Sequence, residues 1–291
     1  MAYGFNNIRE LVDAEIEGKS VVSYFRKSPV QVTLARQWFD LSIAPTSPGA
    51  QYYASFPLTS TVLTQSSNRG MYHGGDVSTG YKYLRSIAMW NIFPTTLSCT
   101  FLLLDYLMYY PYIDESVATE QVMTNSSSLT RYTDGEGVQM MLITIAGRGA
   151  GQTFTVNYTN SAGVAGRTTK ATITSVGSTQ GNISTSADAV DNSAAPFLPL
   201  QEGDTGVRSV EGFSMVSGTD YGLNTLVLVK PLTKMFTLSN AGSSSAIEID
   251  FFRDYSSIPR IYNNAYLNMI CLPNGSVASA NLIGEIKTVW S

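Results

Sequence analysis

The chain has 291 residues, of which 44% are hydrophobic and only 14% are charged, and its formal net charge is −4. Soluble domains typically carry roughly 25% charged residues. The low charge, with many Ser, Thr, Gly and Tyr residues, suits a β-rich protein whose surface is largely used for contacts. The acidic balance argues against a dedicated nucleic-acid-binding protein, which would normally show a basic face.

The N-terminal residues 6–26 have helical spacing of apolar side chains, and Gly18 breaks or bends this helix. Residues 20–25 are β-branched and aromatic, so they either restart the helix or pass into a strand. We interpret residues 1–28 as an arm, which either docks on a neighbouring protein or packs on its own domain. This N-terminus lacks the basic start, apolar middle and small-residue cleavage site of a signal peptide.

Residues 29–291 are expected to form one β-rich domain. The alternation at the start of residues 30–43 predicts that this stretch forms its first strand. Residues 65–79 contain three glycines and many small polar residues, which predicts a long exposed loop.

The longest apolar run is LSCTFLLLDYLMYYPYI, residues 97–113. Asp105 in its middle and Pro111 near its end argue against a membrane helix, because a charge at mid-bilayer costs roughly 2.5–3.5 kcal/mol and about 20 apolar residues are needed. As a strand, the run is apolar on both faces. It therefore predicts a strand covered on both sides, deep in a β core or between that core and a partner subunit.

The C-terminal two thirds alternate between short strand patterns and turns. We expect a short helix at 118–123, a turn at 132–137, a strand at 138–145, a hairpin from 153–159 and 167–176, a long loop at 179–195, a strand pair at 207–216 and 223–229, and strands at 247–251, 262–272 and 282–290. The stretch 147–196 is a possible hairpin and loop excursion. The pattern predicts a mainly β fold, a β-sandwich or jelly-roll-like domain.

Residues that could carry chemistry are few. His73 is the single histidine, and a triad with Asp76 and a serine is a weak hypothesis beside an exposed polar role. The glycine loop 147–151 is followed by a strand pattern rather than a helix, so it does not predict a nucleotide site. Asp134 and Glu136 resemble only a fragment of a calcium loop and indicate a tight turn.

Glycoside hydrolysis needs two carboxyl groups roughly 5–10 Å apart, so acidic residues that lie close together in the sequence are candidates for it. The candidates are Asp114–Glu115, Glu202–Asp204 and Asp250–Asp254. Asp105 is expected to have a structural role, with Arg208, Arg253 or Arg260 as its guessed partner. We therefore predict no enzymatic activity, no catalytic residue, no cofactor and no metal site.

The two cysteines, Cys99 and Cys271, both lie in apolar runs. Cysteine is among the most buried residue types, so both are expected to be buried free thiols.

Several phrases resemble a family of tailed-bacteriophage virion proteins. The resemblance covers roughly residues 97–290 and rests on LLLDYLMYYPYID (102–114), RYTDGEGVQ (131–139), FTVNYTNSAGVAGR (154–167), PFLPLQEGDTGVRSVE (196–211), LVLVKPL (226–232), PRIYNNAYLN (259–268) and LIGEIKTVW (282–290). It implies a virion component that is made in the host bacterial cytoplasm.

Within that family, the chain lacks the long spine helix expected of a major capsid subunit. The resemblance therefore implies a capsid decoration or cement protein, with the major capsid protein and further copies of itself, as a homotrimer, for partners. Sequence-specific nucleic acid and membrane are not expected partners. Lattice contacts are expected at 1–28, 65–79 and 177–195. The alternative is a tail or fibre component that binds host glycan, possibly with glycoside hydrolase activity.

Overall fold

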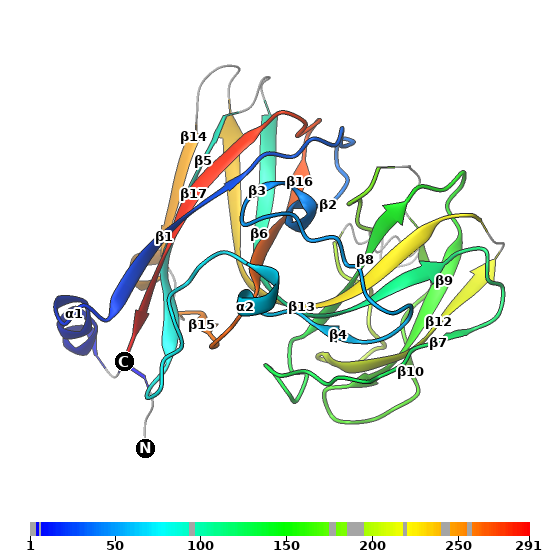
Figure 1. The fold of residues 1–291 in the computed structure, drawn as a ribbon, viewed down its shortest axis with the longest axis horizontal. Helices are drawn as coiled ribbons and strands as arrows, with labels where there is room; N and C mark the ends of the chain where they lie inside the picture. The colour runs from blue at the N-terminus through cyan, green and yellow to red at the C-terminus, as the bar shows by residue number, and fades with distance from the viewer. Residues whose placement is uncertain are drawn as a thin grey trace.

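The structure is a computed structural model that describes residues 4–5, 7–92, 97–174, 179–184, 195–217, 220–239, 245–254 and 258–291. Three antiparallel sheets are stacked in layers (Figure 1). The first sheet has the order β14 (Ser245–Asp250), β5 (Lys82–Ile92), β17 (Asn281–Trp290), β1 (Ser20–Lys27) and β3 (Thr46–Ser47), and β15 (Arg260–Ile261) pairs with β5. The expected mainly β sandwich is confirmed.

The central sheet is built around two long strands, β6 (Leu97–Asp114) and β13 (Leu223–Ser239), which pair along most of their length. Its order is β2 (Phe39–Asp40), β16 (Leu267–Pro273), β6, β13 and β8 (Gln139–Ala146), and β4 (Thr61–Val62) pairs with β6. The third sheet contains β10 (Arg167–Thr168), β9 (Thr153–Asn160), β12 (Val207–Ser217) and β7 (Gln121–Val122), and β11 (Thr172–Ile173) pairs with β9.

The strand β6 confirms the prediction of an apolar run covered on both faces. Leu103 and Leu104 both belong to the core between the first and central sheets, whereas Leu107 and Met108 both belong to the core between the central and third sheets, so each half of β6 is buried on both faces. Successive side chains of a strand point to opposite faces. A strand that lies in the middle layer therefore needs apolar residues at successive positions.

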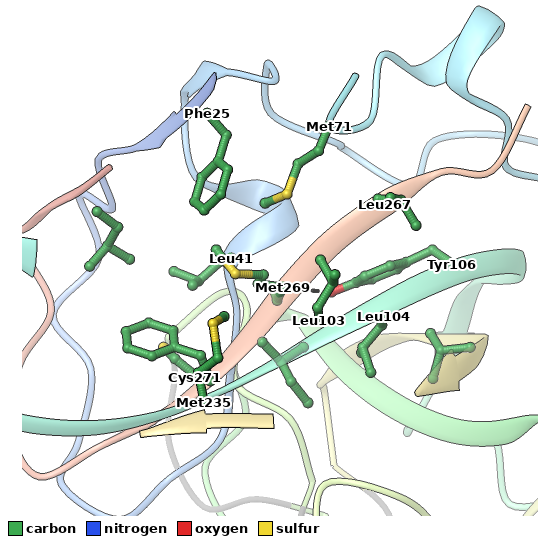
Figure 2. Close-up of a cluster of buried hydrophobic side chains, with 14 of the residues drawn as sticks. Phe25, Leu41, Met71, Leu103, Leu104, Tyr106, Met235, Leu267, Met269 and Cys271 are labelled. Carbon is green, nitrogen blue, oxygen red and sulfur yellow. Dashed lines mark hydrogen bonds between the residues drawn. The ribbon is translucent and has the colours of Figure 1, made fainter. Parts of the chain in front are cut away.

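The first core lies between the first and central sheets. Figure 2 shows part of it, with Phe25 of β1 and Leu103, Met269 and Met235 of the central sheet gathered in one cluster. The Tyr106 hydroxyl donates a hydrogen bond to the carbonyl oxygen of Met269 at 3.3 Å. A buried Tyr hydroxyl needs such an acceptor, since leaving it unpaired costs free energy.

The second core lies between the central and third sheets. Phe154 of β9 stacks on Phe213 of β12, with ring centroids 4.9 Å apart. Tyr158, on the same face of β9, is also fully buried. The predicted hairpin is thus confirmed, but its first strand is a central strand of the third sheet rather than part of an excursion. Residues 175–178 and 185–194 of that stretch lie outside the described residues.

The N-terminal region divides into a helix and a sheet strand. Helix α1 (Ile8–Ile16) is capped by the side chain of Asn7, which accepts a hydrogen bond from Glu10 N at 3.1 Å. Residues 20–27 pair along their whole length with β17. The strand alternative for residues 20–25 is therefore confirmed, and only the residues before β1 lie outside the sheet.

Three local predictions are wrong. Of the strand expected at 30–43, only Phe39–Asp40 (β2) forms, and Val30, Val32 and Leu34 are exposed, because residues 30–35 are held by single hydrogen bonds such as Thr33 Oγ1 to Gly275 O (3.1 Å) instead of a ladder. No helix forms at 118–123; two of these residues form β7. The strands β12 and β13 do not pair with each other, because β12 pairs with β7 and β9 while β13 pairs with β6 and β8.

The segment 65–79 is only partly an exposed loop. It begins with the short helix α2 (Gln65–Asn68), and its middle enters the core, where Met71 and His73 are buried. Two other short helices are η1 (Leu41–Ile43) and α3 (Phe251–Asp254). No helix among the described residues has the length and apolar character needed to cross a membrane.

Candidate functional site: an open strand edge beside helix α1

The outer edge of β1 has few backbone partners. β17 pairs with one side of β1 from Ser20 to Lys27, but on the other side β3 pairs only with Arg26 and Lys27. No described residue gives a hydrogen bond to the backbone of residues 20–25 on that side. Since alternate residues of an antiparallel strand direct N–H and C=O to each side, this edge presents free donors and acceptors.

The sequence of this edge, SVVSYF, contains no charged residue and no proline. Natural sheet proteins usually protect an edge with Lys, Pro or a bulge, because an unprotected edge pairs with other chains. Val22 is 44% exposed and Tyr24 is 69% exposed on the outer face of the sheet. The edge therefore has the composition of a strand that receives a neighbour.

Helix α1 lies on the outer face of the same sheet, over β17 and β5. Lys287 is directly opposite Val22 in the β1–β17 ladder, and its ammonium group forms a 2.7 Å ion pair with Glu15 of α1. The helix packs on the sheet through Leu11 and Ala14, which contact Val289. Glu15 also lies 3.6 Å from Arg85 of β5, so the C-terminal turn of α1 covers the outer face of β17 between β1 and β14.

The opposite side of α1 is apolar as well. Ile8, Val12 and Ile16 follow one another at a spacing of four residues, so they form one stripe on the helix. They are 60%, 49% and 78% exposed. We name the five side chains Ile8, Val12, Ile16, Val22 and Tyr24 the assembly surface, since they are apolar and exposed on α1 and on the outer face of β1.

The sequence gave partial signals for this surface. Helical spacing identified the apolar positions of α1, but the buried face is formed by Leu11 and Ala14 rather than by the isoleucines. The β-branched and aromatic residues 20–25 suggested a strand but could not show that its outer side has no neighbour. Both features depend on which segments pack together in space.

The candidate catalytic histidine has a structural role. His73 is fully buried, and Nε2 lies 3.0 Å from Ala265 O while Nδ1 lies 3.1 Å from Lys82 Nζ. Because an ammonium group only donates, Nδ1 accepts and Nε2–H donates. Burial, and then the Lys82 charge, lower the pKa of His73 to about 4. The prediction of an exposed polar histidine is wrong, and neither ring nitrogen faces a serine.

In each of the three candidate acidic pairs, one carboxylate forms an ion pair with an arginine. Glu115 is fully buried with Arg148 at 2.6 Å, Asp204 binds Arg167 at 2.9 Å, and Asp250 binds Arg85. Burial opposes the charge of Asp204, but hydrogen bonds from Arg167, Tyr158 and Asn160 hold its pKa at about 2. All three carboxylates are engaged in ion pairs within the chain, and the lowered pKa of Asp204 is the opposite of the raised pKa that glycoside hydrolysis needs in its acid.

The glycine loop 147–151 and the turn at Asp134 and Glu136 are both held by hydrogen bonds within the chain. The Asp220 carboxylate accepts hydrogen bonds from Gly149 N (2.9 Å) and Ala150 N (2.7 Å), which holds the glycine loop in place. Asp134 accepts a hydrogen bond from Glu136 N at 3.1 Å, as in a tight turn. Within the described ranges, no group of three His, Cys, Asp or Glu side chains is arranged to hold a metal ion.

Asp105 forms an ion pair with Arg131 and accepts a hydrogen bond from Tyr266 N, so the guessed partners Arg208, Arg253 and Arg260 were wrong. Cys99 and Cys271 are buried free thiols, as expected. Burial, followed by the contact with Cys271, raises the pKa of the Cys99 thiol well above its usual value.

Comparison with family models, curated proteins and solved structures finds no match to this chain.

Proposed function

We propose that this chain is a structural protein of a tailed-bacteriophage particle, a capsid decoration protein that binds the assembled head and associates with further copies of itself. The observation that carries the proposal is the open edge of β1 together with the exposed apolar stripe of α1. The resemblance of residues 97–290 to phage virion proteins is the reason for proposing a phage particle as its location. The major capsid protein and neighbouring copies are the proposed partners.

The mechanism is a binding equilibrium. A protein that binds the assembled shell, and not its free subunits, stabilises the shell by mass action. Several contacts made at once by an oligomer add avidity without any stronger single contact. Apolar side chains such as Ile16 and Tyr24 contribute by leaving water, at roughly 25 cal/mol per Å² of apolar surface buried.

The first test is the number of copies in purified particles, measured by quantitative mass spectrometry against the major capsid protein. The decoration proposal expects hundreds of copies in a fixed ratio to the capsid protein. A few to tens of copies would contradict it and would favour the alternative of a tail or fibre component. Absence from the particle would overturn a structural role altogether.

The second test uses the assembly surface. Tyr24→Lys places a charge at the edge of β1 on an outward-facing side chain, so it blocks strand addition without entering the core. Tyr52→Lys is the matched control, because Tyr52 is 72% exposed and lies outside the assembly surface. Analytical ultracentrifugation and co-sedimentation with heads should show loss of association for Tyr24→Lys only. Equal behaviour of the two variants would contradict the assignment of the surface.

A further inference from the structure

A small cavity beside β15 contains an arginine that is fixed between two aromatic rings. The guanidinium carbon of Arg260 lies 3.7 Å from the ring centre of Tyr81 and 4.2 Å from that of Tyr262. On its far side, Tyr262 packs against Tyr132, with ring centres 4.6 Å apart. The guanidinium therefore contacts two aromatic rings, which restrict its orientation.

The hydrogen-bonding edge of Arg260 remains free. Its side chain is half-buried, and no described residue accepts a hydrogen bond from its guanidinium or forms an ion pair with it. By contrast, Arg131 of the same cavity is used fully, since it binds both oxygens of Asp105 and two backbone carbonyls. Arg260 thus offers forked N–H donors in a fixed orientation, which is the geometry that binds a planar anion at two points.

The cavity has a positive lining. Its volume is about 210 Å³, and Lys82 and Arg131 line it together with Arg260, while its lining includes no Asp or Glu. Asp105 neutralises Arg131, and the charge of Lys82 is attracted to that of Asp76. The net effect is a site with one uncompensated, stacked guanidinium and the exposed side chain of Thr130 at its rim.

We propose that this cavity is a binding site for a carboxylate, of the size of an Asp or Glu side chain, held by the paired N–H groups of Arg260. One free guanidinium matches the single charge of a carboxylate, whereas a phosphate dianion leaves one charge unpaired. The faces of Tyr262 are already covered by Arg260 and Tyr132, so this ring is no platform for a sugar. The site is independent of the proposed function, and its test uses the isolated chain.

The test is a titration of the isotope-labelled full chain with acetate and with glutarate at constant ionic strength, followed through the Arg260 Nε–H resonance and, in all variants, through the backbone amide of Thr130 in the cavity lining. The Arg260 resonance should shift and saturate. In Arg260→Gln the affinity should fall about tenfold or more, because charge-assisted hydrogen bonds are lost. Arg260→Lys keeps the charge but not the fork, so it should also bind more weakly. Arg36→Gln, an exposed arginine elsewhere, is the matched control and should bind like the unaltered chain.

Three outcomes would overturn the proposal: no saturable shift with either carboxylate, equal affinity in Arg260→Gln, or tighter binding of inorganic phosphate than of glutarate. If Arg260→Gln fails to fold, as judged by its amide spectrum, the affinity of Arg260→Lys is compared with that of the unaltered chain instead. Equal affinity of these two proteins would then overturn the proposal. A short peptide that contains Glu, compared with the same peptide that contains Gln, then distinguishes a protein side chain from a free acid as the source of the carboxylate.

Discussion

Asp105 and Arg131 form a buried, two-pronged ion pair at the point of β6 where the two hydrophobic cores meet. Arg131 Nε lies 2.9 Å from Asp105 Oδ2 and Nη2 lies 2.8 Å from Oδ1. The same Nη2 donates to the carbonyls of Leu63 and Tyr106, and Asp105 also accepts from Tyr266 N. The pair therefore ties four chain segments together, and its polar atoms have partners in the absence of water.

Removing one member of this pair is expected to destabilise the protein strongly. Arg131→Met leaves a buried, uncompensated carboxylate, which typically costs about 3–5 kcal/mol in free energy of unfolding. The double variant Asp105→Leu with Arg131→Met should lose less than the sum of the two single variants, because no charge is left unpaired. Urea unfolding of all four proteins measures this coupling. Additive losses would show that the ion pair is energetically unimportant.

Acid should destabilise the fold through His73. The ordinary pKa of 6.5 applies in the unfolded chain, and the pKa in the folded chain is about 4. Between these values the unfolded state binds a proton that the folded state does not, so the free energy of unfolding falls as the pH drops from about 6.5 to about 4. The full loss is about 3 kcal/mol.

His73→Gln removes that titration and keeps a polar side chain. The difference between the unfolding curves of the unaltered chain and His73→Gln isolates the histidine from the carboxylates, which titrate in both. This difference should depend on pH in the window from about 6.5 to about 4. A constant difference across the window would contradict the assignment of a buried neutral histidine.

Gly284 of β17 is expected to tolerate no side chain. The ring of Phe25 and the carbonyl oxygen of Ala88 occupy the space where a Cβ atom would lie. Gly284→Ala should therefore cost about 1–3 kcal/mol, as overpacked cores do. Gly49→Ala is the control, because nothing lies within 4 Å of its Cβ position, and it should change stability by less than about 1 kcal/mol. Thermal unfolding measures both variants.

Two N-terminal deletions should distinguish the contribution of α1 to stability from that of β1. Deleting residues 1–17 removes the helix, whose contact with the sheet is limited to Leu11, Ala14 and a few neighbours, and should leave a folded protein with a lower Tm. Deleting residues 1–28 also removes β1, which takes Phe25 from the core and exposes the edge of β17. Circular dichroism should therefore show a folded shorter deletion and an unfolded or insoluble longer one. Equal stability of the two would contradict the role of β1.

The two cysteines should be unreactive in the folded protein. Cys99 and Cys271 are both less than 2% exposed, and only the thiolate reacts with thiol reagents. Since burial raises the pKa of Cys99, its thiolate is scarce at neutral pH. A colorimetric thiol reagent should therefore label neither cysteine in buffer and both in denaturant. Rapid labelling of the native protein would contradict this burial.

The strands with long patterns could be predicted from the sequence, whereas contacts between distant segments could not. The apolar run of β6 predicted a covered strand because every successive residue must satisfy one of two cores. The alternation of Val30, Val32 and Leu34 was misleading, since alternation describes side-chain direction in an extended chain and does not show whether a neighbouring strand exists.

The site residues show the same limit. The need of Asp105 for a cation followed from its apolar neighbours, but Arg131 could not be selected from the other arginines without the fold. The burial of His73 gave no local signal, because its surroundings of small and polar residues have the composition of an exposed loop. The stacking of Arg260 between Tyr81 and Tyr262 joins residues about 180 positions apart in sequence.

The shared strands β6 and β13 determine how the protein can come apart. Each contributes residues to both hydrophobic cores, so neither core can melt while the other keeps its full set of strands. We therefore expect the two cores to unfold in one transition, with a calorimetric enthalpy equal to the van 't Hoff enthalpy.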